Sequence, residues 1–260
     1  MRPQFPEGFD PRTVCLSVDV EWASPAVLAD LRSLLDERRL HATFFVTHGS
    51  VDVPGHERGI HPNFRRNGDI AKAFCAKFGD AGMPDDAAVY AHVVAVFKDF
   101  VPEARGVRAH SLHYDSVLLP IYERYGIEYD SSYQMPLVRD LRPFWKECGV
   151  LEIPIYFNDY FELKARAIGF EATKIDLDAP GLKVFLMHPN ILYLNAESEG
   201  HYLSTKGFYR EPDRLLAARH RGRGIRTLMI ELLDRLAAGG YPTMTLGEVN
   251  SIWRSHPMWN

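Results

Sequence analysis

The order of apolar and polar residues along the chain predicts strands that alternate with helices. Residues 13–22, TVCLSVDVEW, are rich in β-branched side chains and have the length of a strand. Residues 24–40 carry leucines at helical spacing, after Ser24 as N-cap and Pro25 at the first helical position. Residues 41–49, HATFFVTHG, are a nearly continuous apolar run. Strand, helix and apolar strand in this order are typical of a βαβ unit with buried parallel strands.

The alternation continues to the end of the chain. We expect helices within 68–79, 84–104, 115–127 and 222–240, and strands within 106–110, 128–134, 150–159, 181–190 and 241–249. Pro120 should kink or split one helix, and residues 190–209 lack clear periodicity, as in a lid or an insertion. No linker, repeat or low-complexity segment interrupts the pattern. We therefore expect a single α/β domain over residues 1–260, a parallel (β/α) barrel that is complete or distorted.

Composition limits the partners of this domain. The 260 residues carry a net charge of -4, which gives no reason to expect nucleic acid or an anionic membrane as partner. No apolar stretch approaches the roughly 20 residues that span a bilayer, so we expect no membrane insertion. The first residues, MRPQFPEGFDPRTV, lack the pattern of a signal peptide. Three widely spaced cysteines fit reduced thiols, and the expected location is cytoplasmic.

Polar side chains gather where the predicted strands end. In β/α barrels the catalytic groups lie at the carboxyl ends of the strands. Within a strand, side chains alternate between faces, so two polar residues that are two positions apart point the same way. Two carboxylates on one side need a cation or a proton between them. The polar residues at strand ends are Asp19 and Glu21 in SVDVEW, His61 in GIHPN, Arg108 and His110 in GVRAH, and His188 in FLMHPN.

Each of these residues alone has an ordinary structural explanation. An acidic pair at a strand end is more often solvated or salt-bridged than catalytic, and a single histidine is more often a core residue than a ligand. A lone arginine is most often part of a surface ion pair. Their joint placement at strand ends is what favours a site.

Six segments, in this order, carry a resemblance to a known family: LSVDVEW, ATFFVTHG, GHERGIH, GVRAH, YDSSY and FLMHP. From about residue 14 to 249 the chain resembles the polysaccharide deacetylases of the NodB-homology type, carbohydrate esterase family four. It is most similar to the branch linked to surface-polysaccharide and O-antigen biosynthesis. The resemblance implies a distorted (β/α) barrel and a metal-dependent hydrolase that removes an N-acyl group, most simply acetyl, from an amino sugar.

The resemblance also implies catalytic roles. Asp19 matches the general base that activates water, and Arg108 the residue that holds this base by a charge-assisted pair. His188 matches the general acid that protonates the leaving amine. A backbone N–H near Ser111 would contribute to the oxyanion site.

The implied metal site departs from the family at one position. Glu21 and His61 match two ligands, but Arg65 stands where most members have a second histidine, and an arginine cannot ligate a divalent ion. His110, where a proline is usual, is the proposed replacement, with His113 as a more distant candidate. Carboxylate and imidazole ligands suit Zn²⁺, and also accept Co²⁺, Ni²⁺ or Fe²⁺.

The expected substrate is a carbohydrate, a sugar nucleotide or a lipid-linked sugar. The basic run RHRGRGIR at 219–226 is either solvated or a grip on phosphate. Two other functions remain open: a catalytically inactive glycan-binding protein that has lost its metal, and an amidase or deformylase acting on another C–N bond. Aromatic side chains could stack on sugar rings, although core packing is their commoner use. The candidate substrate-binding residues are Trp22, Arg65, Ser111, His113 and Tyr133.

Overall fold

The computed structural model describes residues 5–78 and 82–256, which contain ten strands of one sheet. Along the chain the strands are β1 (Val14–Asp19), β2 (Ala42–Val46), β3 (Glu57–Ile60), β4 (Gly106–Val107), β5 (Tyr129–Asp130), β6 (Phe144–Trp145), β7 (Leu151–Glu152), β8 (Phe157–Asn158), β9 (Lys183–Met187) and β10 (Thr243–Met244).

The described residues also form ten α-helices and four 3₁₀ turns. The helices are α1 (Pro25–Asp36), α2 (Asp69–Cys75), α3 (Asp86–Phe100), α4 (Leu118–Arg124), α5 (Asp159–Ala165), α6 (Pro189–Leu194), α7 (Glu199–Ser204), α8 (Pro212–Ala217), α9 (Ile225–Ala237) and α10 (Leu246–Ser255). The 3₁₀ turns are η1 (His110–Leu112), η2 (Glu147–Gly149), η3 (Ala172–Lys174) and η4 (Lys206–Phe208). None of the described helices is both long and apolar enough to span a lipid bilayer.

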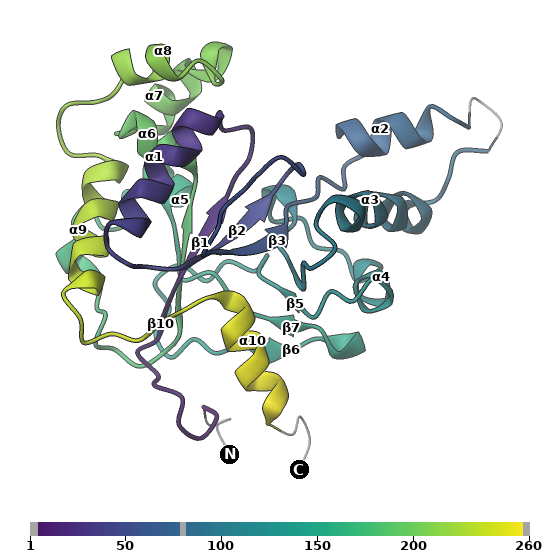
Figure 1. Cartoon of the computed structure of the whole chain (residues 1–260), viewed down its shortest axis with the longest axis horizontal. Helices are drawn as coiled ribbons and strands as arrows, with labels where there is room; N and C mark the ends of the chain where they lie inside the picture. Colours follow the sequence, from purple (N-terminus) through teal and green to yellow (C-terminus); the bar gives the residue numbers. More distant parts are fainter. Residues whose placement is uncertain (1–4, 79–81, 257–260) are drawn as a thin grey trace.

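The sheet has the order β6-β7-β5-β4-β3-β2-β1-β9-β8, and β10 also pairs with β1. The pairing is parallel except between β6 and β7. In Figure 1, α1, α6 and α9 cover one side of the curled sheet, whereas α3 and α4 lie beyond its other half. The path ends at β6 and β8 and forms no closed ring of strands within the described residues. The prediction of a distorted (β/α) barrel is therefore confirmed.

The central strands are mostly apolar, as expected for strands that are covered on both faces. Every residue of β1, β2 and β9 is buried, as expected for parallel strands between layers of helices. Leu16, Phe44 and Phe185 from these three strands are fully inaccessible and belong to the core. The buried strands fix where each chain segment leaves the sheet, and so place the polar residues that follow.

The helix that follows β1 forms as the sequence predicts. The Ser24 hydroxyl accepts a hydrogen bond from the backbone N–H of Val27, and Pro25 occupies the first turn. Pro120, in contrast, neither kinks nor splits a helix. Helix α4 begins only at Leu118, so the proline lies in its first turn, where a missing N–H is tolerated.

Two segments differ from the predicted elements. Residues 190–209 are not irregular, because they fold into α6, α7 and η4 beside the strand ends, and whether they act as a lid stays a prediction. The strand expected within 241–249 is only two residues long. The Thr245 hydroxyl accepts a hydrogen bond from the backbone N–H of Glu248, and the Glu248 carboxylate accepts one from the backbone N–H of Thr245. This capping box starts α10.

Candidate active site

Two acidic residues leave the end of β1 in different backbone conformations. Asp19 is the last residue of the strand and is 3% exposed. Glu21 follows in a turn, with φ 49° in the left-handed region that is uncommon for residues other than glycine. The Thr47 hydroxyl donates a 2.6 Å hydrogen bond to the Glu21 carbonyl and helps to hold this turn. Strand alternation, which we used to orient Glu21 from the sequence, therefore does not apply beyond Asp19.

The three predicted metal ligands lie together. Glu21 Oε1 is 3.4 Å from His61 Nε2 and 3.1 Å from His110 Nδ1. All three ligand atoms lie within 4.8 Å of one another. Burial opposes the charge of Glu21, but the hydrogen bonds with His110 and His61 outweigh it and hold the pKa of this carboxyl far below its usual range. A carboxylate and two imidazoles around one point form a donor set that fits a divalent transition metal.

A contact outside this donor set fixes the tautomer of His61. Its Nδ1 lies 2.7 Å from the Arg108 carbonyl, which can only accept, so Nδ1 carries the proton and donates it. In the neutral ring, Nε2 then carries a lone pair and can serve as a metal ligand, whereas in the protonated ring it donates to Glu21. Orientation of a metal-binding histidine by a backbone carbonyl is typical of metal sites.

His110 reaches this point from a turn. Strand β4 ends at Val107, and His110 opens η1, where Ser111 has φ 58°. The His110 ring lies edge-on to the His61 ring, with 5.4 Å between centroids. The prediction that His110 points toward the pocket agrees with the structure, but the turn, and not strand alternation, directs it.

Arg65 and His113 do not join the cluster. Arg65 is exposed and lies outside the residues that line the two cavities beside Glu21. The His113 ring lies 3.3 Å from the Tyr90 hydroxyl and packs against Phe64. Their predicted roles in substrate binding stay predictions.

The predicted pair of Arg108 and Asp19 is present in the core. Arg108 is fully buried, and its Nη1 donates to Asp19 Oδ1 at 3.0 Å and to the Ser17 hydroxyl at 2.9 Å. Its other nitrogens donate to the carbonyl and the hydroxyl of Ser131, each at 2.7 Å. This network fixes Asp19 Oδ1 and leaves Oδ2 facing His61, 3.8 Å from Nε2, and His188, 4.0 Å from Nε2.

A buried network also supports the turn that carries His110. The Ser132 hydroxyl accepts from the backbone N–H of Ala109 at 2.9 Å and donates to Asp130 at 2.5 Å. Lys146 bridges Asp130, at 2.8 Å, and Glu152, at 2.5 Å. The chain therefore uses two separate sets of buried charges to place the residues after β4.

His188 has a partner that the sequence reasoning missed. Its backbone N–H donates to Asp159 Oδ2 at 2.6 Å, and its ring Nδ1–H donates to Oδ1 at 2.5 Å. Burial opposes protonation of the ring, but fully buried Asp159, with Asp19 and Glu21, raises the pKa of His188 to about 9. Asp159 directly follows β8, so it carries the same signal, an acidic residue at a strand end, that singled out Asp19.

The Asp159→Asn variant should lower the pKa of His188 from about 9 toward the ordinary 6.5, because the Asp159 carboxylate, which favours the protonated ring, is lost. A general acid is active while protonated, so the alkaline fall of kcat/KM should shift to lower pH. NMR titration of His188 measures the pKa directly. An unchanged pKa in the variant would exclude Asp159 as the cause.

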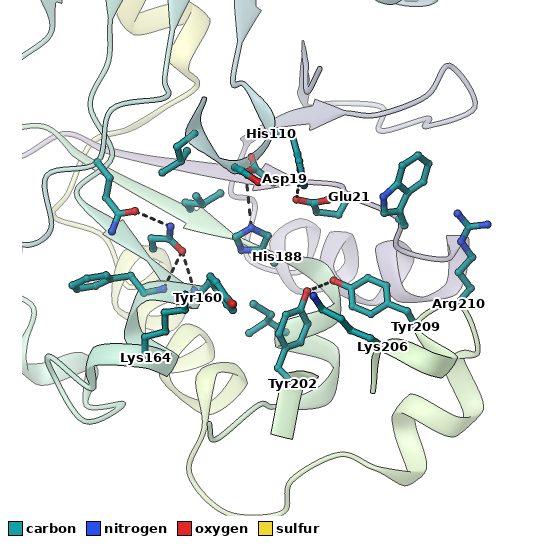
Figure 2. A pocket seen from close by; sticks show the side chains of 18 residues that line it. Asp19, Glu21, His110, Tyr160, Lys164, His188, Tyr202, Lys206, Tyr209 and Arg210 are labelled. Atoms are coloured by element: carbon teal, nitrogen blue, oxygen red, sulfur yellow. Dashed lines mark hydrogen bonds and ion pairs between the residues drawn. The ribbon is translucent and has the colours of Figure 1, made fainter. Parts of the chain in front are cut away.

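The strand ends open into a cavity of about 740 Å³. Figure 2 shows His188 at its centre, with Asp19, Glu21 and His110 on one side. Trp22 and Ser111, two predicted substrate-binding residues, line this cavity. The cavity is lined by Asp19, Glu21, Trp22, His110, Ser111, Leu112, Gln134, Asn158, Tyr160, Phe161, Lys164, Leu186, His188, Ile191, Tyr202, Lys206, Tyr209 and Arg210.

A second cavity of about 310 Å³ lies against the same ligands and shares Glu21, Trp22, His110 and Arg210 with the first. Tyr133 lines neither cavity. It is 53% exposed and packs edge-on against Phe144, so its role with substrate stays a prediction.

The basic run 219–226 is engaged elsewhere. Arg219 donates to the Tyr193 carbonyl at 2.5 Å, and Arg223 and Arg226 pair with carboxylates of α9 and α1. None of the run lines either cavity beside Glu21. The structure therefore places no arginine of this run beside Glu21, where a phosphate-binding role at the site would require it.

Comparison with known proteins adds three findings. A family profile described as WbmS-like polysaccharide deacetylase matches residues 16–206. A Bordetella bronchiseptica structure, provisionally described as a polysaccharide deacetylase involved in O-antigen biosynthesis, is 25% identical with TM-score 0.71, covering 85% of this chain and 90% of that one. A Mycobacterium smegmatis structure, provisionally described as a polysaccharide deacetylase, is 15% identical with TM-score 0.56, and the match covers 97% of this chain and 94% of that one. No curated protein matches at a significant level.

Proposed function

The chain belongs to the WbmS-like polysaccharide deacetylases, and from this premise we propose that it hydrolyses the N-acyl group, most simply acetyl, of an amino sugar in a surface-polysaccharide precursor. One observation carries the proposal. Glu21, His61 and His110 converge on one point, and Asp19 and His188 meet beside it in one cavity. The O-antigen description of the Bordetella bronchiseptica structure supports the choice of a surface polysaccharide.

The donors fit a divalent metal, which we propose is Zn²⁺, although Co²⁺, Ni²⁺ or Fe²⁺ would accept the same ligands. Glu21 Oε1, His61 Nε2 and His110 Nδ1 would hold it. When bound, such an ion polarises an acyl carbonyl and acidifies water.

Asp19 and His188 divide the proton transfers. Asp19 Oδ1 is held by Arg108, so Oδ2 is the oxygen that accepts the proton from the attacking water. His188 Nε2 faces Asp19 Oδ2 at 4.0 Å, on the same cavity. A pKa of about 9 keeps its ring protonated at neutral pH, ready to donate to the nitrogen as the C–N bond breaks. The products are a free amine and a carboxylic acid.

Product analysis tests the function. Protein loaded with Zn²⁺ or Co²⁺ is incubated with N-acetylated amino sugars, their 1-phosphates and their nucleotide conjugates, and acetate and free amine are quantified. We expect equimolar acetate and amine with at least one of them. Release of formate from an N-formyl sugar alone would favour the deformylase alternative. Metal and sugar binding without any release would instead favour the inactive glycan-binding protein.

A further inference from the structure

One wall of the 740 Å³ cavity is cationic. Lys206 lies in η4 and Arg210 shortly after it, and both line the cavity. In Figure 2, Lys206 lies beside Tyr202 and Tyr209, and Arg210 stands at the far end of the same wall, across from Asp19 and His110. These two cations belong to the segment that packs after β9, and not to the strand ends that carry the metal ligands.

The charges of this wall are not neutralised inside the cavity. The cavity has two lining carboxylates, and both are engaged: Asp19 pairs with Arg108, and Glu21 contacts His61 and His110. The other two cations that line the cavity are both paired, Lys164 with Glu199 at 3.3 Å and the protonated His188 with Asp159 at 2.5 Å. Among residues 5–78 and 82–256 no carboxylate forms an ion pair with Lys206 or Arg210, and Glu199, which lies near Lys206, is engaged by Lys164 and the Tyr160 hydroxyl. The charge of Lys206 and Arg210 is therefore available to a ligand.

Aromatic groups accompany the free cations. The guanidinium of Arg210 lies over the Trp22 ring, 5.4 Å from its centroid, and Trp22 is 45% exposed. The hydroxyls of Tyr202 and Tyr209 are hydrogen-bonded to each other beside Lys206. Burial raises the pKa of both tyrosines, which keeps them neutral. An exposed indole suits the face of a sugar ring, and an unpaired lysine and arginine suit anionic oxygens.

We propose that Lys206 and Arg210 bind a negatively charged group, a phosphate or a carboxylate, attached to the amino sugar that the site deacylates. This inference rests on the proposed function for its reacting group, because the wall lies across the same cavity from Asp19 and the metal ligands. The substrate is then an anionic amino sugar, either a sugar phosphate or an N-acylated uronic acid. Both cations are exposed, so a neutral amino sugar would leave them solvated, whereas an anionic group could pair with them.

Calorimetric binding to metal-loaded protein tests the proposal with three probes. These are the neutral methyl glycoside of N-acetylglucosamine, N-acetylglucosamine 1-phosphate, and the methyl glycoside of N-acetylglucosaminuronic acid. We expect at least one charged probe to bind about tenfold more tightly than the neutral one, as one charge-assisted hydrogen bond allows. The charged probe that binds more tightly shows whether the anionic group of the substrate is a phosphate or a carboxylate. Equal affinity for all three would overturn the proposal.

Variants locate the effect. The double change Lys206→Gln and Arg210→Gln should remove the tenfold preference, so that in this variant the charged and neutral probes bind with similar Kd values. Arg214→Gln is the matched control, because Arg214 pairs with Glu211, stacks on Phe208 and does not line the cavity, so the preference should persist. A preference that survives in the double variant, or vanishes in Arg214→Gln, contradicts the assignment.

Failure of the proposed function would be visible separately. The calorimetry needs no turnover, so a charge preference that depends on Lys206 and Arg210, found without any release of acetate or amine, would retain the anion site and reject the deacylase. Acetate release without a charge preference would retain the deacylase and reject the anion site. High salt should weaken binding of the charged probe alone, because screening acts on its ion pairs.

Discussion

His110→Ala protein should fail to retain stoichiometric Zn²⁺. His110 supplies one of three donors, and its Nδ1 lies 3.1 Å from Glu21 Oε1, so the alanine leaves a carboxylate and one imidazole. Changes to residues outside the ligand set of a metal site usually cost about 10–100-fold in affinity, and loss of a ligand should cost more. Metal analysis of purified protein, after equilibration with Zn²⁺ and desalting, measures the stoichiometry.

Two variants serve as controls. His113→Ala removes a histidine three positions away that contacts Tyr90 instead of the cluster, and it should bind one equivalent. Arg65→Ala should do the same, because Arg65 is exposed and lines neither cavity beside Glu21. Full metal content in His110→Ala would show that the second histidine has not been replaced in this way. Reduced metal content in His113→Ala would point to a different ligand set.

Asp19→Asn should lower the rate of deacylation by about 10²–10⁴-fold, because an amide cannot accept the proton that general-base catalysis requires. The change also removes the anionic partner of Arg108, whose side chain is fully buried. Breaking a buried ion pair from one side typically costs about 3–5 kcal/mol, and the amide oxygen can retain part of this through the bond with Nη1. The Tm should therefore fall as well.

Acetate release and thermal unfolding, measured on the same preparations, separate the two effects. Ser17→Ala is the matched variant, since it removes another hydrogen bond to Arg108 Nη1 and leaves the base in place. It should lose stability with a much smaller loss of rate. Asp19→Asn protein that turns over within about threefold of the unaltered chain would exclude Asp19 as the general base.

Local patterns predicted the parts of this structure that local interactions decide. The apolar runs of β1, β2 and β9 and the Ser24 cap of α1 are such parts, since neighbouring residues determine them. The convergence of Glu21 and His110 was also expected, but the expected cause, alternation within strands, was wrong. Strands β1 and β4 already end at Asp19 and Val107, and the turns that follow contain residues with positive φ. Residues other than glycine rarely adopt positive φ, so their residue types did not predict these turns.

Contacts between distant segments could not be predicted from one sequence. Asp159 and His188 are 29 positions apart and meet because β8 pairs with β9. The cationic wall depends in the same way on how residues 190–209 fold over the strand ends, and their mixed polarity hid three helical elements. Basic residues at 219–226 were conspicuous as a run, yet neighbouring carboxylates and a carbonyl engage three of them.

The two proton-transfer groups depend on strands with different numbers of neighbours. Asp19 ends β1, whereas His188 depends on Asp159, which directly follows β8. Strand β1, which ends in Asp19, pairs with β2, β9 and β10, whereas β8, which leads to Asp159, pairs with β9 alone among the described strands and has on its other side only a bridge between Ile155 and Gln134 and a side-chain hydrogen bond from Asn158 to Gln134. Amides of β1 should therefore exchange with solvent more slowly than those of β8, because fewer strands must separate to expose the β8 backbone. An opening of β8 that reached Asp159 would remove the partner of His188 while β1 stays paired, so we expect the acid to be lost before the base as the protein loosens.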